Sequence, residues 1–336
     1  MSISLLNSAT ILHRRAAPCA SVLALCAAAL VLLAVCVPLP AQTSSHSSTS
    51  ADAVWQQNLS TWRAQREHSL AAPDGWLTLV GLEWLKSGVN SIGSAADNTI
   101  RLGEHAPAHI GMLTVSGKTP KDTIIQLLSP NGGFPAGFTL NGRPAREGTL
   151  TISDTKPSTM ECNGISLVVL ARGDRFALRI KDANAPTRTA FHGLHWYAPD
   201  AGYRVTARWI PYLPARVEKI PTVIGTTLDM PAPGVAEFLL KGKVYLLEPV
   251  LEGGDSTHLF FILRDTTAST TTYGAGRFLT TGLPDHGLAQ PGSLTLDFNE
   301  LYNPPCAYTP YATCPLPPEK NRLPVDIEAG EQRYTP

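Results

Sequence analysis

The chain has 336 residues, of which 43% are hydrophobic and 16% charged, and its 28 Pro and 27 Gly indicate many turns. This composition favours a turn-rich β protein over a helical bundle. The 27 basic and 27 acidic residues give a formal net charge of zero, which argues against nucleic-acid binding and against adsorption to anionic lipid, because both need an excess of positive charge.

The N-terminus has the layout of a secretory signal peptide, predicted over residues 1–41. Arg14 and Arg15 precede a nearly uncharged apolar run that ends in PLPAQ, and cleavage after Ala41 would release the mature chain. One alternative is an uncleaved membrane anchor, since the run is just long enough to span a bilayer. Another is lipidation at Cys36. The sequence therefore predicts an exported protein, periplasmic or extracellular, with no other membrane association.

The mature chain is expected to begin with a tether and a helix. Residues 42–51 are polar and rich in Ser, which predicts a disordered tether. Residues 52–71 predict an amphipathic helix, because Trp55, Leu59 and Trp62 recur at i, i+4 and i+7. We expect the apolar side of this helix to pack on a sheet.

Beyond the helix the periodicity becomes that of β-strands. Short apolar or alternating runs are divided by Gly, Asn, Asp and Pro, a pattern typical of a sandwich or barrel. The run VAEFLLKGKVYLLEPVL predicts a hairpin with Lys241 and Gly242 at its turn. We predict a mainly β fold with a β-sandwich over 72–185. A second β unit, sandwich or barrel-like, is expected over 186–336 and ends in a strap rich in Pro and Cys.

Part of the first β unit resembles the forkhead-associated (FHA) family. The stretches GVNSIGSAADNTIRL and TLNGRPA follow that family's order of a glycine turn, an Asn-x-Ile-x-Leu strand and an Asn-Gly turn. The matching residues are Gly93, Asn98, Ile100, Leu102, Asn141 and Gly142. The resemblance implies a β-sandwich. The phosphate-binding arginine, serine and histidine of that family are not reproduced, since Ser94, Pro107 and Gly111 stand near their places, which argues against phosphopeptide binding.

A longer resemblance runs from about Trp62 to Glu331. The stretches PDGWLTLVGLEWLKSGVNSIG, YGAGRFL and LDFNELYNPPCAYTPYATCPLPPEKNRLPVDIEAGE are similar to a bacterial family catalogued as a domain of unknown function, DUF1684. This resemblance implies a family and supplies no mechanism.

The strap, residues 302–324, is the most unusual stretch. Its seven prolines fix φ and remove backbone donors, so it is expected to lie over the β unit and to form neither a helix nor a central strand. Cys306 and Cys314 are predicted to form a disulfide that stabilises the fold by roughly 2–3 kcal/mol, which leaves Cys162 as an unpaired thiol. A rigid loop can equally present binding groups. The candidate binding residues are Tyr273, Asn303, Tyr308, Tyr311 and Asn321.

Polar residues just before the strap are the candidates for chemistry. Arg277 follows a Gly-rich turn, and Asp297 and Asn299 share one face of an alternating segment. Arg277 either pairs structurally with Asp297 or joins Asp297, Asn299 and Tyr302 in a polar pocket that binds an anion. In the second case these four residues are the catalytic candidates.

Metal and cofactor chemistry has little support in the sequence. His192 and His195 are three positions apart, with no diagnostic spacing around them, so no metal and no cofactor are predicted. No G-x-S-x-G elbow, P-loop or dinucleotide fingerprint occurs. The favoured function is a non-catalytic envelope module that binds a small molecule, a glycan or a protein. The alternative is an enzyme, hydrolase-like, with its pocket near Arg277, Asp297 and Asn299.

Overall fold

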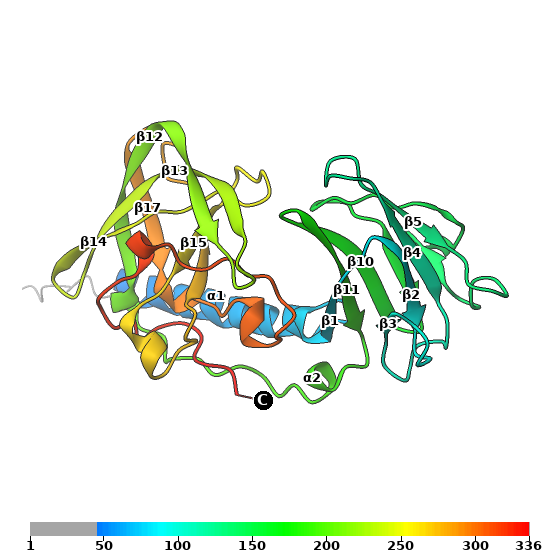
Figure 1. Cartoon of the computed structure of the whole chain (residues 1–336). Helices are drawn as coiled ribbons and strands as arrows, with labels where there is room; N and C mark the ends of the chain where they lie inside the picture. Colours follow the sequence, from blue (N-terminus) through cyan, green and yellow to red (C-terminus); the bar gives the residue numbers. More distant parts are fainter. Residues whose placement is uncertain (1–45, 336) are drawn as a thin grey trace, which may run out of the picture. The chain divides into compact units, whose positions relative to one another are not determined.

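The structure, a computed structural model, describes residues 46–335 (Figure 1). The predicted signal peptide, its cleavage site after Ala41 and the lipidation alternative at Cys36 lie outside these residues. Helix α1 spans His46–Leu70, so the prediction of a disordered tether is wrong for residues 46–51. No helix in the described part of the chain is both long and apolar enough to cross a membrane.

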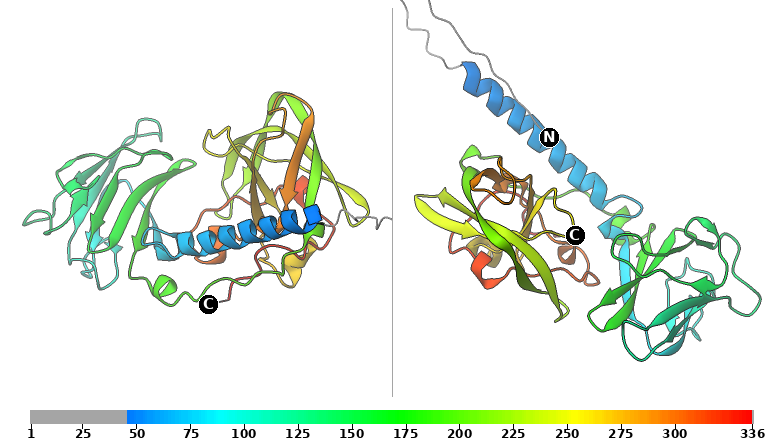
Figure 2. Two further views of the ribbon diagram at one scale, coloured as in Figure 1. Left: turned by 180° about the vertical axis from the view of Figure 1, so that it is seen from behind. Right: turned by 90° about the horizontal axis from the view of Figure 1, so that it is seen from above.

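The apolar stripe of α1 faces the protein. Leu59 is 1% exposed, and Trp55 and Trp62 are partly buried. The stripe packs mainly on irregular segments. The Trp55 indole N–H donates to the Asp297 carboxylate, and the centroids of the Trp62 and Tyr302 rings lie 6.4 Å apart. Figure 2 shows α1 from two directions.

The first β unit is a sandwich of two sheets. The first sheet contains, in spatial order, β1 (Leu79–Trp84), β11 (Arg175–Asp182), β10 (Ile165–Arg172), β9 (Thr159–Cys162), β6 (Thr139–Leu140) and β7 (Arg143–Pro144). The second contains β3 (Ile100–Arg101), β2 (Gly88–Gly93), β4 (Gly111–Ser116), β5 (Ile124–Leu128) and β8 (Gly148–Thr149).

A shared core holds the two sheets together. Leu113 and Ile125 from the second sheet join Leu167, Val169 and Leu178 from the first in one buried cluster. These residues occupy alternate positions of their strands, as the period of two requires. The predicted β-sandwich is therefore confirmed.

The second β unit has two further sheets. One has the order β14 (Lys243–Leu247), β13 (Thr227–Leu240), β12 (Arg204–Pro221) and β17 (Gly292–Asp297); the other pairs β15 (Leu259–Leu263) with β16 (Arg277–Thr281). Trp209, Phe238, Phe261 and Phe298 lie in the core of this unit. The mainly β fold class is confirmed, and in the described residues these strands do not close into a barrel.

The β13–β14 hairpin has the predicted turn. Lys241 and Gly242 both have positive φ, 49° and 76°, which is the geometry of a tight type I′ connection. The remaining helical turns are short: α2 (Pro186–Thr189), η1 (Trp76–Thr78), η2 (Ala201–Tyr203), η3 (Thr266–Ser269), η4 (Phe298–Glu300), η5 (Pro305–Ala307) and η6 (Glu319–Asn321).

The strap is packed into the protein along its length. Its backbone forms single bridges to the sheets, as at Tyr302 with Phe278 and at Pro315 with Thr222. The predicted disulfide is absent, because Cys306 and Cys314 are both free thiols. The two residues are nevertheless adjacent, and the backbone N–H of Cys306 donates to Cys314 Sγ at 3.2 Å. Burial and hydrogen bonds, with no covalent bridge, hold the strap in place.

Candidate functional site

Arg277, the first catalytic candidate, is enclosed by the protein. It is 1% exposed, and its Nη2 donates to Asp265 Oδ2 at 2.8 Å and to the Ile327 carbonyl at 2.9 Å. Its Nη1 donates to the Ala329 carbonyl. The predicted pairing of Arg277 with Asp297 is therefore wrong, because Asp265 at the start of η3 supplies the carboxylate. Arg277 ties the C-terminal segment to β16.

Asp297 and Asn299 form a turn. Asp297 Oδ1 accepts hydrogen bonds from the backbone and side-chain nitrogens of Asn299 at 3.0 and 2.9 Å, and its Oδ2 accepts the Trp55 indole N–H at 2.6 Å. Asn299 in turn binds the backbone of Asp200. Asp297 and Asn299 are therefore a turn-forming pair, and the fold brings neither residue to Arg277.

Glu300, beside this turn, provides a test of the local electrostatics. Burial, and then the charge of Asp297, raise its pKa to about 7 from an ordinary 4.5, against an opposing effect of Arg204. Because the folded state holds this proton more tightly, the native protein loses stability as the pH rises from 4.5 through 7. After allowance for solvent, we expect Glu300→Gln to be about 1.5 kcal/mol more stable than the native chain at pH 8 and equal to it near pH 4.

Urea unfolding at both pH values measures this difference. Glu319→Gln, at an exposed position in η6, is the control and should show no such pH dependence. A Glu300→Gln variant that loses stability at pH 8 would contradict the assignment.

Tyr302, Asn303 and Tyr308 line a buried acid. Glu331 is 0% exposed and accepts the Asn303 backbone N–H at 3.0 Å, its amide at 2.7 Å and the Tyr308 hydroxyl. The Arg66 guanidinium from α1 lies 3.7 Å from the Glu331 carboxylate and stacks on the Tyr302 ring at 4.6 Å. These contacts fasten the strap to α1 and to the C-terminal segment.

The other candidate binding residues also serve the strap. Asn321 is 1% exposed and binds the backbone of Glu248 and the carbonyl of Ile262. The Tyr273 hydroxyl donates to the Cys306 carbonyl at 2.9 Å. Among the five candidates only Tyr311 is exposed, at 38%. Tyr273, Asn303, Tyr308 and Asn321 therefore hold the strap in place through buried hydrogen bonds.

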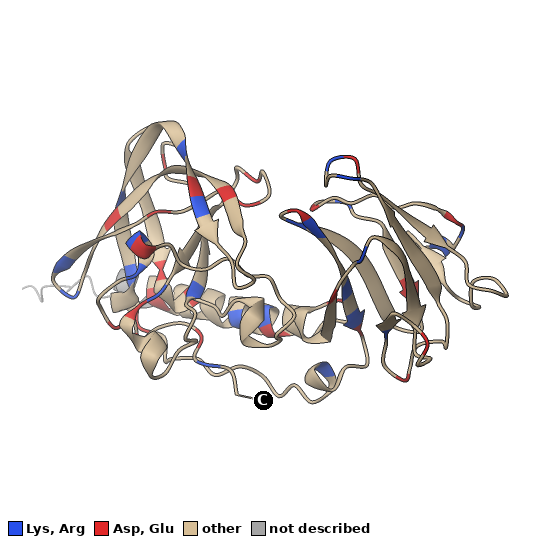
Figure 3. Cartoon of the chain, in the orientation of Figure 1, with Lys and Arg blue, Asp and Glu red and all other residues tan. Residues whose placement is uncertain are grey.

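The sequence analysis missed a hollow of about 410 Å³ on the outer face of the first sheet. We call it the basic pocket; it is lined by Asp74, Ser153, Asp154, Pro157, Thr159, Glu161, Ser166, Val168, Leu170, Arg172, Arg179 and Lys181. The register pairs Val168 with Arg179 and Ser166 with Lys181 across β10 and β11, so these side chains share one face. Basic positions recur along this hairpin (Figure 3).

Arg179 is the unusual member of the basic pocket. Its Nε is buried without a hydrogen-bond partner, and no hydrogen bond or ion pair among the described residues reaches its guanidinium. Its guanidinium carbon lies 5.2 Å from the centroid of the Trp76 ring, and Arg172, Cys314 and Asp154 act on it by charge alone. Burial, and then the charge of Arg172, lower its pKa to about 10. A half-buried guanidinium normally has an anionic partner.

The other charges are arranged around Arg179. Lys181 donates to the Asp74 carbonyl, and burial lowers its pKa. Arg172 Nη1 lies 3.6 Å from Asp154, whose side chain is 85% exposed. Glu161 is also exposed. The cations therefore lie within the basic pocket, and the carboxylates lie at its solvent-exposed rim, where screening weakens their attraction.

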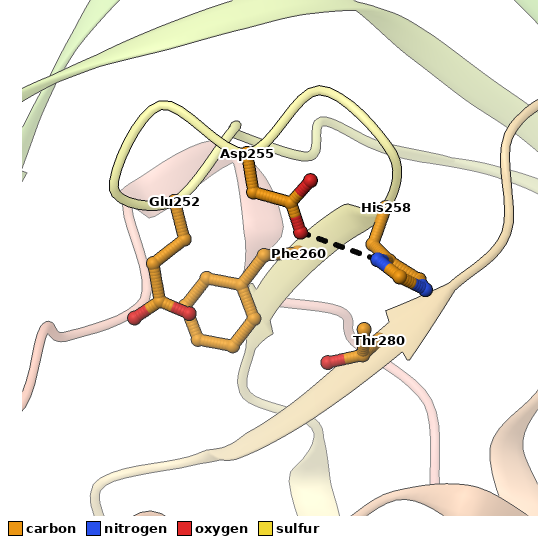
Figure 4. Close-up of a pocket in the computed structure, with 5 residues that line it drawn as sticks. All are labelled: Glu252, Asp255, His258, Phe260 and Thr280. Carbon is orange, nitrogen blue, oxygen red and sulfur yellow. Dashed lines mark hydrogen bonds and ion pairs between the residues drawn. The ribbon is translucent and has the colours of Figure 1, made fainter. Parts of the chain in front are cut away.

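A second hollow of about 140 Å³ is lined by Glu252, Asp255, His258, Phe260 and Thr280; we call it the acidic pocket. In Figure 4 the Asp255 carboxylate points to His258, whose Nδ1 is 3.2 Å away. The Thr280 hydroxyl lies 3.2 Å from the Tyr302 hydroxyl, so Tyr302, one of the predicted catalytic candidates, lies next to this pocket.

The acidic pocket shifts the pKa values of its two carboxyl groups in opposite directions. The Thr257 hydroxyl and backbone N–H, with a smaller effect of His258, lower the pKa of Asp255 to about 2. Burial, and then the charge of Asp255, raise the pKa of Glu252. Two acids with opposed pKa shifts beside an oriented imidazole are the arrangement that acid–base catalysis uses.

Comparison with protein families identifies the second half of the chain. A family model described as Protein of unknown function (DUF1684) matches residues 189–332. Residues 189–332 form a DUF1684 domain. The predicted resemblance to this family is confirmed, although the matched range begins well after Trp62. The DUF1684 domain contains the strap, the enclosed Arg277 and the whole acidic pocket, whereas the basic pocket precedes it.

Comparison with solved structures gives partial likenesses. An uncharacterized protein of Haloarcula marismortui is 33% identical over 44% of this chain and 79% of its own, with a TM-score of 0.38. An FHA domain studied for phosphothreonine-dependent interactions, and the FhaA FHA domain in a complex, are each 15% identical over 30% of this chain, with TM-scores of 0.20. They are covered over 92% and 97% of their lengths. A search of curated proteins gave no match.

Proposed function

We propose that the protein is an exported binding module whose ligand is a small carboxylate- or phosphate-bearing molecule, held in the basic pocket without chemical change. The observation that carries this proposal is Arg179, a half-buried guanidinium without a carboxylate partner. Its planar fork matches the geometry of carboxylate and phosphate oxygens. Export is supported by the basic and apolar N-terminal sequence alone.

The surroundings of Arg179 suit a small ligand. Val168 and Leu170 supply an apolar floor, and Ser166, Thr159 and Lys181 supply donors along the walls. The volume of about 410 Å³ falls in the usual range of small-molecule sites. A ligand that carries one anionic group and a short apolar part would satisfy the unpartnered cation and cover the floor.

Thermal unfolding with added phosphate, sulfate and small carboxylates tests this proposal. A ligand at about ten times its Kd should raise the free energy of unfolding by about 1.4 kcal/mol. The variant Arg179→Met should lose this response, and Arg101→Met, at an exposed position of β3, should retain it. An unchanged response in Arg179→Met would contradict the proposal.

A second candidate function, a hydrolase-like enzyme, is favoured by the acidic pocket. The hydrogen bond between Asp255 and His258 Nδ1 orients the imidazole, which leaves Nε2 as the nitrogen that exchanges a proton with a substrate. Glu252, with its raised pKa, would be the proton donor.

Chromogenic ester, phosphoester and glycoside substrates test this candidate. Any turnover at the acidic pocket should fall by about 10²-fold or more in His258→Gln. His286→Gln is the matched control, because His286 is also exposed beside an aspartate, Asp285, at 3.8 Å. Turnover that survives His258→Gln, or the absence of turnover, favours the binding module.

A further inference from the structure

The two cysteines of the strap are held next to each other by separate parts of the fold. Cys306 lies in η5 (Pro305–Ala307), and its carbonyl accepts the Tyr273 hydroxyl at 2.9 Å. Cys314 is tied to the end of β12 through its carbonyl, which accepts the Val223 N–H at 3.0 Å. Because proline-rich backbone on each side fixes both residues, the two sulfurs are preorganised for each other.

The two thiols are not equivalent. Cys314 is 5% exposed, whereas Cys306 is partly exposed. The Cys314 thiol donates a hydrogen bond to the Cys306 sulfur, and this bond lowers the pKa of Cys306 to about 7. The same bond, followed by burial, raises the pKa of Cys314. The accessible sulfur is therefore the one that is favoured as a thiolate, which is the reactive form of cysteine.

We infer that Cys306 and Cys314 form a redox-active dithiol site, in which Cys306 attacks a hydroperoxide and Cys314 resolves the product. The Cys306 thiolate attacks one oxygen of the peroxide, the O–O bond breaks, and the departing alkoxide or hydroxide takes a proton from water. The product is a sulfenic acid on Cys306. The Cys314 sulfur then attacks the Cys306 sulfur, an S–S bond forms, the S–O bond breaks, and the hydroxide leaves with the Cys314 proton as water.

An external dithiol closes the cycle. Its thiolate attacks the disulfide, and a second exchange releases both protein thiols and the oxidised dithiol. Tyr308 and Asn321 anchor the strap to Glu331 and to the Glu248 carbonyl, so these anchors do not depend on a bond between the two sulfurs. This site adjoins the basic pocket, since Arg172 donates to the Thr313 hydroxyl at 2.9 Å and the charge of Arg179 acts on Cys314. Disulfide formation between the two sulfurs needs no ligand in the basic pocket, so the two proposals can still fail separately.

Peptide mass mapping of the full chain tests the inference. The chain is first reduced with dithiothreitol, which is then removed, and hydrogen peroxide is added. The expected product is a disulfide between Cys306 and Cys314 that dithiothreitol reverses, with Cys162, buried in the sandwich core at 3% exposure, left as a free thiol. Before peroxide is added, Cys306 should react with iodoacetamide at pH 7 about tenfold faster than Cys162.

Two serine variants separate the roles of the thiols. In Cys314→Ser the sulfenic acid on Cys306 has no resolving thiol, so dimedone should label Cys306. In Cys306→Ser, dimedone should label neither Cys162 nor Cys314. The inference is wrong if peroxide leaves both strap thiols reduced in the native chain, if Cys314 is labelled in Cys306→Ser, or if Cys306 reacts no faster than Cys162.

Discussion

Replacing Asp265 with alanine is expected to lower the free energy of unfolding by about 3–5 kcal/mol, because it leaves a buried guanidinium without its counter-charge. Asp265 and Arg277 are 3% and 1% exposed, and the two side chains meet at 2.8 Å. Asp265 Oδ1 also accepts the backbone N–H groups of Thr267 and Ile327 at 3.0 and 3.2 Å. The variant therefore loses the ion pair, the cap of η3 and an anchor of the C-terminal segment together.

Urea unfolding measures this loss, with an exposed ion pair as the control. Lys219 and Asp229 meet at 3.0 Å, with side chains 75% and 61% exposed, so Asp229→Ala should cost less than about 1 kcal/mol. The double variant Asp265→Leu with Arg277→Met should recover much of the loss, because an apolar pair needs no counter-charge. A cost below about 1 kcal/mol for Asp265→Ala would show that water reaches Arg277.

Arg179→Met is expected to raise the free energy of unfolding of the ligand-free protein by about 2 kcal/mol while it abolishes anion binding. Methionine has a similar volume and removes a partly desolvated charge whose Nε has no partner. It retains the contact with Trp76, which lies beside the guanidinium. If Arg179 serves binding and not folding, its replacement should raise the free energy of unfolding and abolish anion binding.

The control is a cation of the same strand that is exposed. Arg175 stacks on the Trp84 ring at 3.7 Å, so Arg175→Met removes a charge without relieving burial and should not stabilise the protein. A loss of stability in Arg179→Met would mean that Arg179 is a structural residue, and the basic pocket would then lose its main support as a binding site.

Local patterns were sufficient to predict the main elements of the fold. Alternating apolar residues predicted the sandwich, because the strand period of two places Leu167 and Val169 in the core. The stripe of Trp55, Leu59 and Trp62 predicted α1, and the Lys241–Gly242 pair predicted its hairpin turn. Each of these features depends on neighbours within a few residues, and such neighbours are visible in a sequence.

Partners distant in the sequence were not predictable in the same way. The predicted partner of Arg277 was Asp297, but the fold brings Asp265 to its guanidinium. The segment RFALRIKD does show Arg179 and Lys181 on one face of a strand, a signal that could have been found. The pocket appears only once the register pairs Arg179 with Val168. Thr280 likewise joins Glu252 in the acidic pocket from another strand.

The disulfide prediction shows where the physical argument was too narrow. Spacing and proline content correctly indicated that Cys306 and Cys314 lie together, but adjacency does not determine oxidation state. The redox conditions around the protein determine whether the two thiols are oxidised. The same adjacent pair is therefore also suited to a dithiol site that switches between the reduced and the disulfide form.

A crystal structure determined with selenate tests the central claim most directly, because the anomalous signal of selenium locates an oxyanion independently of the protein atoms. We predict a selenate in the basic pocket, within hydrogen-bonding distance of the Arg179 guanidinium and close to Lys181. Selenate bound at other surface cations while the basic pocket contains only water, or an Arg179 side chain paired with Asp154, would contradict the account.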